Sequence, residues 1–463
     1  MNDAPISFYK NLYEQQRHFF ESGKTRSYAF RKQQLLRLKN AIRSHEDLIT
    51  EALYQDLHKP ATESYTTEIG FVYEEINYTL KHLKDWMKPQ RVSTPIIVQP
   101  AQSKIYRDPL GLTLLIAPWN YPFQLLISPL VGAIAGGNCA VLKPSEETTH
   151  TAQAIEKLIN DTFAPEYISV VQGNGAVVVP ALMENCSFDH VFFTGSVAVG
   201  KIIMAAAAKN LTPVTLELGG KSPCIVDETA NLPVTARRIA WGKFLNAGQT
   251  CVAPDYLIVQ ESVKDQFVRL IAESLRNFYG EDPAHSPDYP RMLNKKRFDA
   301  VTKFLNNGRI LLGGQTNEAD KYIAPTLLDN ITPEDPVMQE EIFGPVLPIL
   351  TYRQLTEVPQ IITHQPYPLA LYLFTTSSDN EKYIMNTVRF GGGCVNDTVL
   401  HLANPAIPFG GVGTSGLGSY HGKYSFDTFT HAKGVLKETT RLDIPLRYPP
   451  YEKKARYVKW FMD

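Results

Sequence analysis

The chain has 463 residues, more than one hydrophobic core usually organises, so its length predicts two or three packed domains. Its 46 Lys and Arg residues nearly balance 47 Asp and Glu residues, and no run of like charges stands out, which argues against nucleic acid as a partner. The five cysteines form no CxxC or Cys/His pair, which argues against a zinc site or a disulfide scaffold and favours a reducing compartment.

Residues 1–90 are expected to form packing helices, because apolar residues recur there at helical spacing. These residues are Leu35, Leu36, Leu38 and Ile42 in one run, and Ile69, Val72, Ile76, Leu80 and Leu83 in the next. The N-terminus has no basic segment followed by an apolar one, which is the pattern of a secretory signal. We therefore expect a cytoplasmic protein.

Two stretches between residues 91 and 142 change character. Residues 91–109 are β-branched and bounded by prolines, which predicts an extended hairpin. Residues 109–142 carry no charge and are long enough for a transmembrane helix, but Pro118, Pro122 and Pro129 would leave polar groups unpaired in lipid. A strand buried on both faces of a parallel sheet explains the same apolar run. Since the end of the chain, KKARYVKWFMD, has no apolar tail, we expect a soluble protein without a membrane anchor.

A regular alternation of strands and helices begins at Leu112. The predicted strands lie at 112–117, 139–143, 167–172, 190–194 and 213–218, and the predicted helices at 123–135, 148–159, 176–184 and 198–208. This pattern predicts βαβ units and a parallel, doubly wound sheet of the α/β class. Ligands of such sheets bind at the carboxyl ends of the strands, where the loops 118–120, 143–146, 173–174, 195–196 and 219–220 lie.

A second α/β pattern follows Lys221 and predicts a second domain that faces the first across a cleft. Its predicted strands lie at 222–227, 256–260, 324–331, 346–352, 369–375 and 394–397, and its predicted helices at 234–248 and 263–278. The glycine-rich run 410–418 is interpreted as a turn. Residues 423–442 are predicted to be strand that could pair with the hairpin.

One cysteine has the surroundings of a nucleophile. Cys251 follows a predicted helix, in a glycine-containing loop that would let the backbone approach a substrate. A single cysteine is more often a packed core residue, so this interpretation depends on other reactive groups. Glu217 could cap a backbone turn or, with a raised pKa in a cleft, accept a proton from water. Asn120, between prolines, could form an Asx-turn or present a fixed amide.

Other loops at the strand ends have features of a nucleotide site. Residues 193–200 follow a strand and begin a helix, which would offer N–H groups and a dipole to a phosphate. They do not form GxGxxG, so an ordinary helix start is the alternative. Lys143 and Glu146 could reach ribose hydroxyls or form a surface ion pair. The loops 341–345 and 407–411 could be irregular loops with a glycine turn.

These motifs, in this order, resemble those of the aldehyde dehydrogenase superfamily. The matching segments are PWNYP, KPSE, FTGSVAVG, ELGGK, GQTC, EEIFGPV and IPFGG, which are spread from about residue 110 to 415, a span that is most of the chain. The short helical segment before them, and the ending SGLGSYHGKYSFDTFTHAKGVL followed by PLRYPPY, resemble the class 3 members. The resemblance implies oxidation of an aldehyde to a carboxylic acid, with medium or long aliphatic and aromatic aldehydes favoured.

The resemblance also implies a role for each candidate residue. Cys251 would be the nucleophile, Glu217 the general base for thioester hydrolysis, and Asn120 an oxyanion donor beside the Cys251 N–H. Glu341 is a rival to Glu217 as the base. The cofactor would be NAD, with NADP possible, and its implied contacts are Trp119, Lys143, Glu146, Gly195, Ser196, Val197, Ala198, Val199, Gly200, Leu218, Glu341 and Phe343. Of these, Lys143 and Glu146 would hold the adenosine ribose, residues 195–200 the pyrophosphate, and Glu341 with Phe343 the nicotinamide ribose.

The chemistry of these groups fits one reaction. An aldehyde cannot lose hydride directly, whereas the adduct of a thiolate can, and the resulting thioester then needs water. An acyl-transferring reductase of the same fold is one alternative, and the carboxylate at Glu217 argues against it. A non-catalytic relative is a second alternative, and the intact Cys251, Asn120 and Glu217 argue against that.

We therefore expect an α/β protein with an aldehyde dehydrogenase-like fold in three parts. A Rossmann-type NAD(P)-binding domain is expected at 1–90 and 109–218, and a second α/β catalytic domain at 219–415. A small β oligomerisation arm with its tail is expected at 91–108 and 416–463. The resemblance implies that this arm bridges to a second subunit in a homodimer, and an exposed hairpin edge with Ile96, Ile97 and Val98 is consistent with that.

Overall fold

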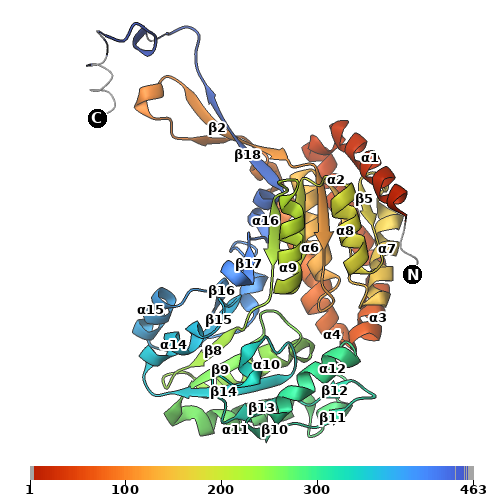
Figure 1. Cartoon of the computed structure of the whole chain (residues 1–463), viewed down its shortest axis with the longest axis vertical. Helices are drawn as coiled ribbons and strands as arrows, with labels where there is room; N and C mark the ends of the chain where they lie inside the picture. The colour runs from red at the N-terminus through yellow and green to blue at the C-terminus, as the bar shows by residue number, and fades with distance from the viewer. Residues whose placement is uncertain (1–4, 444, 453, 455, 457–463) are drawn as a thin grey trace.

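The computed structural model describes residues 5–443, 445–452, 454 and 456, which form two sheets with their helices and one projecting arm (Figure 1). The charged end of the chain at 453–463, on which one prediction rests, lies largely outside the described residues. Within those ranges, none of the helices combines the length and the apolar character that crossing a bilayer requires.

The N-terminal part is helical from Ile6 to Trp86, which confirms the predicted packing helices for the described residues; residues 1–4 lie outside the described residues, and Gln90 begins a strand. Its helices are α1 (Ile6–Glu21), α2 (Tyr28–Ser44), α3 (Glu46–Leu57), α4 (Ala61–Ser64) and α5 (Gly70–Trp86), with a π-helical turn, η2 (Tyr65–Ile69), before α5. The hydroxyl of Ser27 accepts the N–H of Phe30 and so caps α2. The apolar faces of α2 and α5 are buried and pack against each other.

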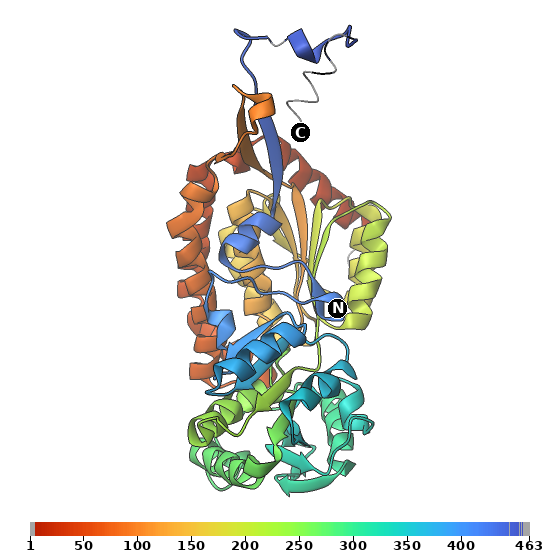
Figure 2. The ribbon, with the colours of Figure 1, turned by 90° about the vertical axis from the view of Figure 1, so that its left-hand side faces the viewer.

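The first sheet has the strand order β17-β7-β6-β3-β4-β5. Its strands are β3 (Leu112–Ile116), β4 (Cys139–Lys143), β5 (Ile168–Val170), β6 (His190–Thr194), β7 (Val214–Glu217) and β17 (Gly416–Leu417). The connecting helices are α6 (Gln124–Gly136), α7 (Thr149–Thr162), α8 (Gly175–Asn185) and α9 (Val197–Ala208). All neighbours except β17 and β7 are parallel, and helices cover both faces of the sheet (Figure 2), so the predicted doubly wound sheet is confirmed.

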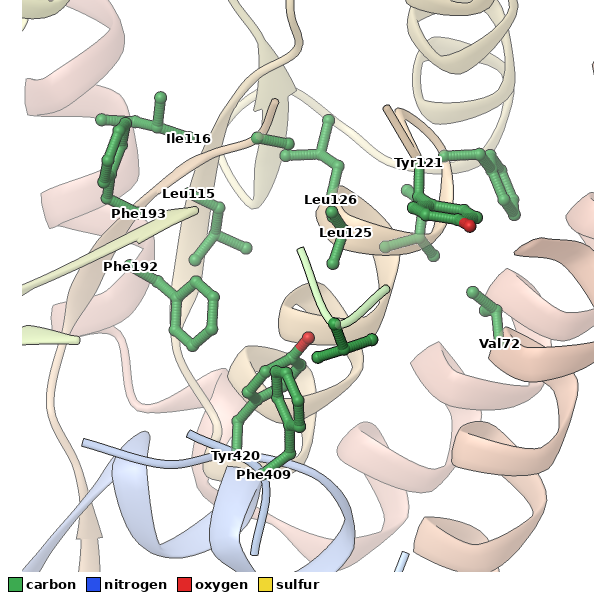
Figure 3. Packing of buried hydrophobic residues seen from close by; sticks show 14 of the residues in the cluster. Val72, Leu115, Ile116, Tyr121, Leu125, Leu126, Phe192, Phe193, Phe409 and Tyr420 are labelled. Carbon is green, nitrogen blue, oxygen red and sulfur yellow. The ribbon is translucent and has the colours of Figure 1, made fainter. Parts of the chain in front are cut away.

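The core under this sheet joins distant parts of the chain. Figure 3 shows Leu115 of β3 and Phe192 of β6 beside Phe409 and Tyr420. The ring centroids of Phe192 and Tyr420 are 5.1 Å apart, and those of Phe409 and Tyr420 are 5.5 Å apart. The segment that contains Phe409 and Tyr420 is thus packed into the hydrophobic core under the first sheet.

Two predictions for this returning segment were wrong. The run 410–418, expected to be only a turn, contains β17, in which Gly416 pairs with Glu217 of β7. Residues 423–442, expected to be strand throughout, begin in the helix α16 (Gly422–Thr428). The aromatic and β-branched residues there favour a strand locally, but the chain forms a helical turn because it buries Phe426 against Trp86 of α5 and Phe429 against α6.

The second sheet has the strand order β10-β13-β14-β9-β8-β15-β16, parallel except for β10 against β13. Its strands are β8 (Pro223–Val226), β9 (Tyr256–Gln260), β10 (Arg309–Leu312), β13 (Thr326–Asp329), β14 (Val346–Tyr352), β15 (Ala370–Phe374) and β16 (Gly392–Val395), and a separate small hairpin pairs β11 (Thr316–Asn317) with β12 (Tyr322–Ile323). Its helices are α10 (Leu232–Phe244), α11 (Lys264–Tyr279), α12 (Lys295–Thr302), α13 (Pro336–Gln339), α14 (Val358–Thr363) and α15 (Ser378–Thr387).

The arm projects from the first sheet on the side away from the second (Figure 1). It consists of β1 (Gln90–Val92), β2 (Gln102–Pro109) and β18 (Thr430–Lys437), all antiparallel, so the hairpin and its pairing with the tail are confirmed. The two elements that precede β18 in the chain are β17, which pairs with the first sheet, and α16, which packs on α6. The division into an NAD(P)-binding domain, a catalytic domain and an oligomerisation arm stays a prediction.

Candidate active site

A cavity of about 310 Å³ lies between the carboxyl ends of the first sheet and the second sheet. Loops of both sheets and the N-terminal helices line it. The predicted site residues in its wall are Trp119, Asn120, Gly195, Ser196, Glu217, Leu218, Cys251, Glu341 and Phe343. The other predicted residues, Lys143, Glu146, Val197, Ala198, Val199 and Gly200, lie outside the wall, at or after the ends of β4 and β6.

The loop before Cys251 has a constrained backbone. After α10, a 3-10 turn (Leu245–Gly248) contains Asn246, Ala247 and Gly248 with φ of 51°, 53° and 76°. A Cβ on Gly248 would lie 2.3 Å from the backbone oxygen of Gly344, so only glycine lets this loop pack against the loop after Glu341. This strained turn fixes the path of the chain that leads to Cys251 at the cavity.

The thiol of Cys251 is protonated at rest. Burial, followed by the nearby carboxylates of Glu341 and Glu217, raises its pKa to about 12, while backbone N–H groups of Cys251 and Val252 act in the opposite direction. A thiolate is the nucleophilic form, so reaction at neutral pH requires a group that accepts the thiol proton.

Asn120 is joined to the cysteine loop through both its side chain and its backbone. Its Nδ2 donates to the backbone oxygen of Gln249 at 3.0 Å, and its own backbone oxygen accepts from Nδ2 of Asn246 at 2.9 Å. The hydroxyls of Tyr121 and Thr250 lie 2.6 Å apart. Asn120 is buried, so its amide has one fixed position relative to residue 251.

Glu217 ends β7 and is buried at the cavity wall. Burial raises the pKa of its carboxyl well above the ordinary value. Neither carboxyl oxygen has a hydrogen-bond partner among the residues that the structure describes. Buried polar atoms are normally paired, so an unpaired carboxyl group in a cavity wall indicates a ligand or water partner.

Glu341 is the second carboxyl group at the cavity. Burial and the charge of Asp255 raise its pKa to about 8. The N–H of Gly220 and the charges of Lys221 and Arg297 act in the opposite direction and lower the pKa. A Cβ on Gly219 would lie 2.0 Å from its Oε2, so the glycine makes room for this side chain. Glu341 can exchange a proton near neutral pH.

The cofactor side of the site begins at α9. Ser196 caps this helix, its hydroxyl accepting the N–H of Val199 at 3.4 Å. Ser196, Ala198 and Val199 are exposed, so the start of the helix is open to an anion. The exposed start of the helix and a glycine-containing wall fit the phosphates of a dinucleotide.

Lys143 and Glu146 lie together at the end of β4. The Nζ of Lys143 donates to Oε2 of Glu146 at 3.0 Å, and the N–H of Gly175 donates to Oε1 at 2.7 Å. Burial acts to raise the pKa of Glu146, but these donors outweigh it and hold the pKa below the ordinary value. The two residues therefore meet, with Glu146 ionised at neutral pH.

Three residues form an aromatic and cationic group between the two sheets. The rings of Trp119 and Phe343 pack edge to face with centroids 5.2 Å apart, and the guanidinium of Arg297 lies 5.2 Å from the Trp119 ring. The sequence analysis predicted Trp119 and Phe343 as cofactor contacts but did not predict Arg297, which also lines the cavity. Its signal is weak, because Arg297 is one of several basic residues in an ordinary amphipathic helix.

Three comparisons bear on these observations. The model of the aldehyde dehydrogenase family matches residues 9–435. The chain is 51% identical over 445 residues to the 4,4'-diaponeurosporen-aldehyde dehydrogenase of Staphylococcus aureus, covering 96% of each chain. It is 47% identical over 439 residues to the dimeric NADP-preferring aldehyde dehydrogenase of Rattus norvegicus, covering 94% of this chain and 96% of the relative. A solved structure described as the substrate-bound state of Staphylococcus aureus AldH superposes with a TM-score of 0.95 at 50% identity, covering 98% and 99%.

Proposed function

The chain belongs to the aldehyde dehydrogenase family, whose members oxidise aldehydes to carboxylic acids with NAD(P), and we propose that it does so through a hemithioacetal and a thioester on Cys251. The observation that carries this proposal is the meeting of Cys251, Asn120 and Glu217 at one cavity. Each of the three supplies a group that the reaction needs.

Asn120 is proposed to stabilise the oxyanion that forms when Cys251 attacks the aldehyde. One N–H of its amide is used by Gln249, and the other remains for a substrate oxygen. The backbone N–H of Cys251 is proposed as the second donor. Removal of one such donor typically lowers the rate by about 10²–10³-fold.

Glu217 is proposed to be the base that activates water against the thioester. Its unpaired carboxyl oxygens and raised pKa suit a group that waits for a water molecule and takes its proton. Glu341 remains the alternative, since its pKa of about 8 also suits proton transfer. Glu341 is held by the N–H of Gly220, which favours Glu217 for the hydrolytic step.

The cofactor is NAD(P), and when bound it supplies the hydride acceptor. We propose that the start of α9 (residues 195–200) and Leu218 hold its pyrophosphate end. Lys143 and Glu146 would bind the adenosine ribose, and Trp119, Glu341 and Phe343 would hold the nicotinamide end. The contact between Lys143 and Glu146 supports the ribose site. The carboxylate of Glu146 has two partners, one on each oxygen, and a ribose hydroxyl can bind to one oxygen while the partner of the other oxygen stays in place.

Medium or long aliphatic and aromatic aldehydes are the proposed substrates. Part of the cavity wall is apolar, and its members include Phe71 of α5, Leu125 of α6, Trp241 of α10, and Leu402 and Phe409 of the segment after β16. Such a wall gains by burying an alkyl chain or a ring and offers little to a charged substrate.

A homodimer in the cytoplasm is proposed as the state of the protein. Ile202 on α9, Leu211 after it and Ile96 on the arm are 62%, 89% and 80% exposed, and we propose that they lie at the interface between the subunits. The five cysteines are free, which suits a reducing compartment.

The test is a panel of aldehydes of increasing chain length and ring content, run with NAD and with NADP and with or without coenzyme A. We expect cofactor reduction without coenzyme A and carboxylic acid as the product. Formation of an acyl-coenzyme A product, with no acid, would favour the acyl-transferring alternative. Absence of any cofactor reduction would favour the non-catalytic one.

A further inference from the structure

The ion pair of Lys59 and Glu68 is fully buried and lies outside the cavity wall. Lys59 lies between α3 and α4, and Glu68 lies in the π-helical turn η2, a feature that is frequent near functional sites. Burying two opposite charges gains little stability overall, because desolvation offsets their attraction. A role for the pair must therefore be inferred from the residues that it contacts.

Glu68 holds the start of α6. Its Oε2 accepts the backbone N–H groups of Phe123 and Gln124 at 2.9 and 3.1 Å, and its Oε1 accepts from Nζ of Lys59. A carboxylate at this position satisfies N–H groups that a helix leaves free and interacts favourably with the helix dipole. The loop that carries Asn120 is thus fixed at its exit.

Lys59 contacts the same loop closer to its start, at Asn120 and Tyr121. Its Nζ donates to the backbone oxygen of Asn120 at 3.3 Å and lies 4.2 Å from the centroid of the Tyr121 ring. Lys59 and Glu68 together therefore contact the backbone or side chains of residues 120, 121, 123 and 124. Neither of them lines the cavity, so neither touches a substrate.

The same loop is tied to the nucleophile on its other side. Asn120 bonds to Asn246 and Gln249, and Tyr121 to Thr250. Glu63, from the same N-terminal segment, accepts the backbone N–H of Asn246 at 2.9 Å. The segment 59–68 thus contacts both loops whose separation sets the distance from the Asn120 amide to the Cys251 thiol.

We propose that the Lys59–Glu68 pair is a positioning device that sets the place of the Asn120 amide relative to Cys251. The inference rests on the proposed role of Asn120 as oxyanion donor. Because an oxyanion donor must meet the oxygen at hydrogen-bond distance in the transition state, a small shift of the loop slows chemistry without removing a catalytic group. Substrate and cofactor binding, which use other residues, do not depend on the pair.

The test measures the first turnover after rapid mixing of enzyme with aldehyde and saturating NAD, in Glu68→Gln and in the double variant Lys59→Met with Glu68→Gln. The double variant leaves no unpaired buried charge, so it stays informative if the single variant does not fold. With enzyme in excess over aldehyde, we expect the rate constant of this first formation of NADH, here called the burst, to fall by about 10²-fold, with NAD binding and the yield of one NADH per aldehyde unchanged.

A double-mutant cycle with Asn120→Ala separates positioning from general damage. If the pair acts through Asn120, Glu68→Gln slows the burst less than about twofold in the Asn120→Ala background, because the group to be positioned is gone. An equal loss in both backgrounds, or a normal burst in Glu68→Gln and in the double variant, overturns the proposal. A normal burst in Asn120→Ala alone instead overturns the proposed role of Asn120, and the positioning proposal with it.

Asp56→Asn is the matched control. Asp56 is also a buried carboxylate from the N-terminal helices, and it accepts the backbone N–H groups of His150 and Thr151 at the start of α7. It has no contact with the loop of Asn120. The variant should lose a comparable helix cap and some thermal stability while its burst rate constant remains that of the parent; a loss equal to that of Glu68→Gln overturns the proposal.

Discussion

Glu217 and Glu341 both line the cavity at Cys251, but the backbone N–H of Gly220 and the charges of Lys221 and Arg297 stabilise the ionised form of Glu341, whereas neither carboxyl oxygen of Glu217 has a partner among the described residues. This difference supports distinct proposed roles for the two carboxyl groups. Glu217, whose oxygens are unpaired among the described residues, is the one free to bind water.

Glu217→Gln should therefore separate hydride transfer from hydrolysis. The variant keeps the size of the side chain but lacks the proton acceptor, so a burst of NADH close to one per active site should be followed by slow turnover. The steady-state rate should fall by about 10²–10⁴-fold, and mass spectrometry should find the acyl group on Cys251. If the burst itself is lost, Glu217 takes the proton of the thiol; if turnover stays near normal, the same measurement on Glu341→Gln identifies the base.

Cys251→Ser should abolish aldehyde oxidation, because a serine hydroxyl at its ordinary pKa has almost no alkoxide at neutral pH. Circular dichroism and NAD binding should match those of the parent. Cys394→Ser is the control, since Cys394 is a half-buried thiol outside the cavity wall, with its sulfur 3.6 Å from Nδ1 of His401. Turnover of Cys251→Ser within about tenfold of the parent would remove Cys251 as nucleophile.

The pKa of Glu341 makes a prediction about stability. Burial raises this pKa to about 8 in the folded chain, against about 4.3 in an unfolded one. The folded state thus keeps a proton that the unfolded state loses between these values, so the contribution of Glu341 to the free energy of unfolding falls as pH rises from about 4.3 to about 8.

Glu341→Gln cannot lose that proton. Thermal unfolding at one scan rate, at about pH 5.5 and about pH 8, should therefore show a smaller loss of stability on raising the pH in the variant than in the parent. Glu340→Gln serves as the control and should lose as much as the parent. Equal losses in the parent and in Glu341→Gln would mean that Glu341 titrates as an ordinary carboxyl group.

Glu146 should set the preference between the two nicotinamide cofactors. Lys143 and Gly175 hold both of its oxygens, so it cannot easily turn away from a 2′-phosphate, and like charges at about 4 Å cost about 1 kcal/mol even in water. We expect NAD to be used well, and Glu146→Ala to raise kcat/KM for NADP relative to NAD by about fivefold or more. Glu147→Ala, one residue further and exposed, should leave the ratio unchanged. Strict dependence on NADP in the parent would contradict the role of Glu146.

The sequence predicted the elements whose pattern is local. The five parallel strands from β3 to β7 were identified because two-sided burial makes them continuous apolar runs between helices of regular length. The strands β10 to β12 were missed because they are short, exposed or antiparallel and have no such pattern. The helix α16 was missed because its aromatic residues are held by packing against α6, which only the folded chain provides.

The site divides in the same way. Cys251, Glu217 and Asn120 could be selected because each lies in a short motif at a strand or helix end, and the structure brings all three to one cavity, while their roles stay predictions. Lys59 and Glu68 could not be selected, because a lysine and a glutamate nine positions apart look like surface residues. Their burial depends on the π-helical turn and on the loop around Asn120, which no local pattern encodes.

The path of the chain also sets when the enzyme can assemble during synthesis. Gly416 pairs with Glu217, and Thr430 with Pro109, so the first sheet and the arm wait for segments made after the whole second sheet. The second sheet, whose strands all lie between 223 and 395, can fold earlier on the ribosome. Until β17 arrives, the strand that carries Glu217 is an open edge. The nascent protein should therefore depend on chaperones most strongly in the interval between completion of the second sheet and synthesis of β17 and β18.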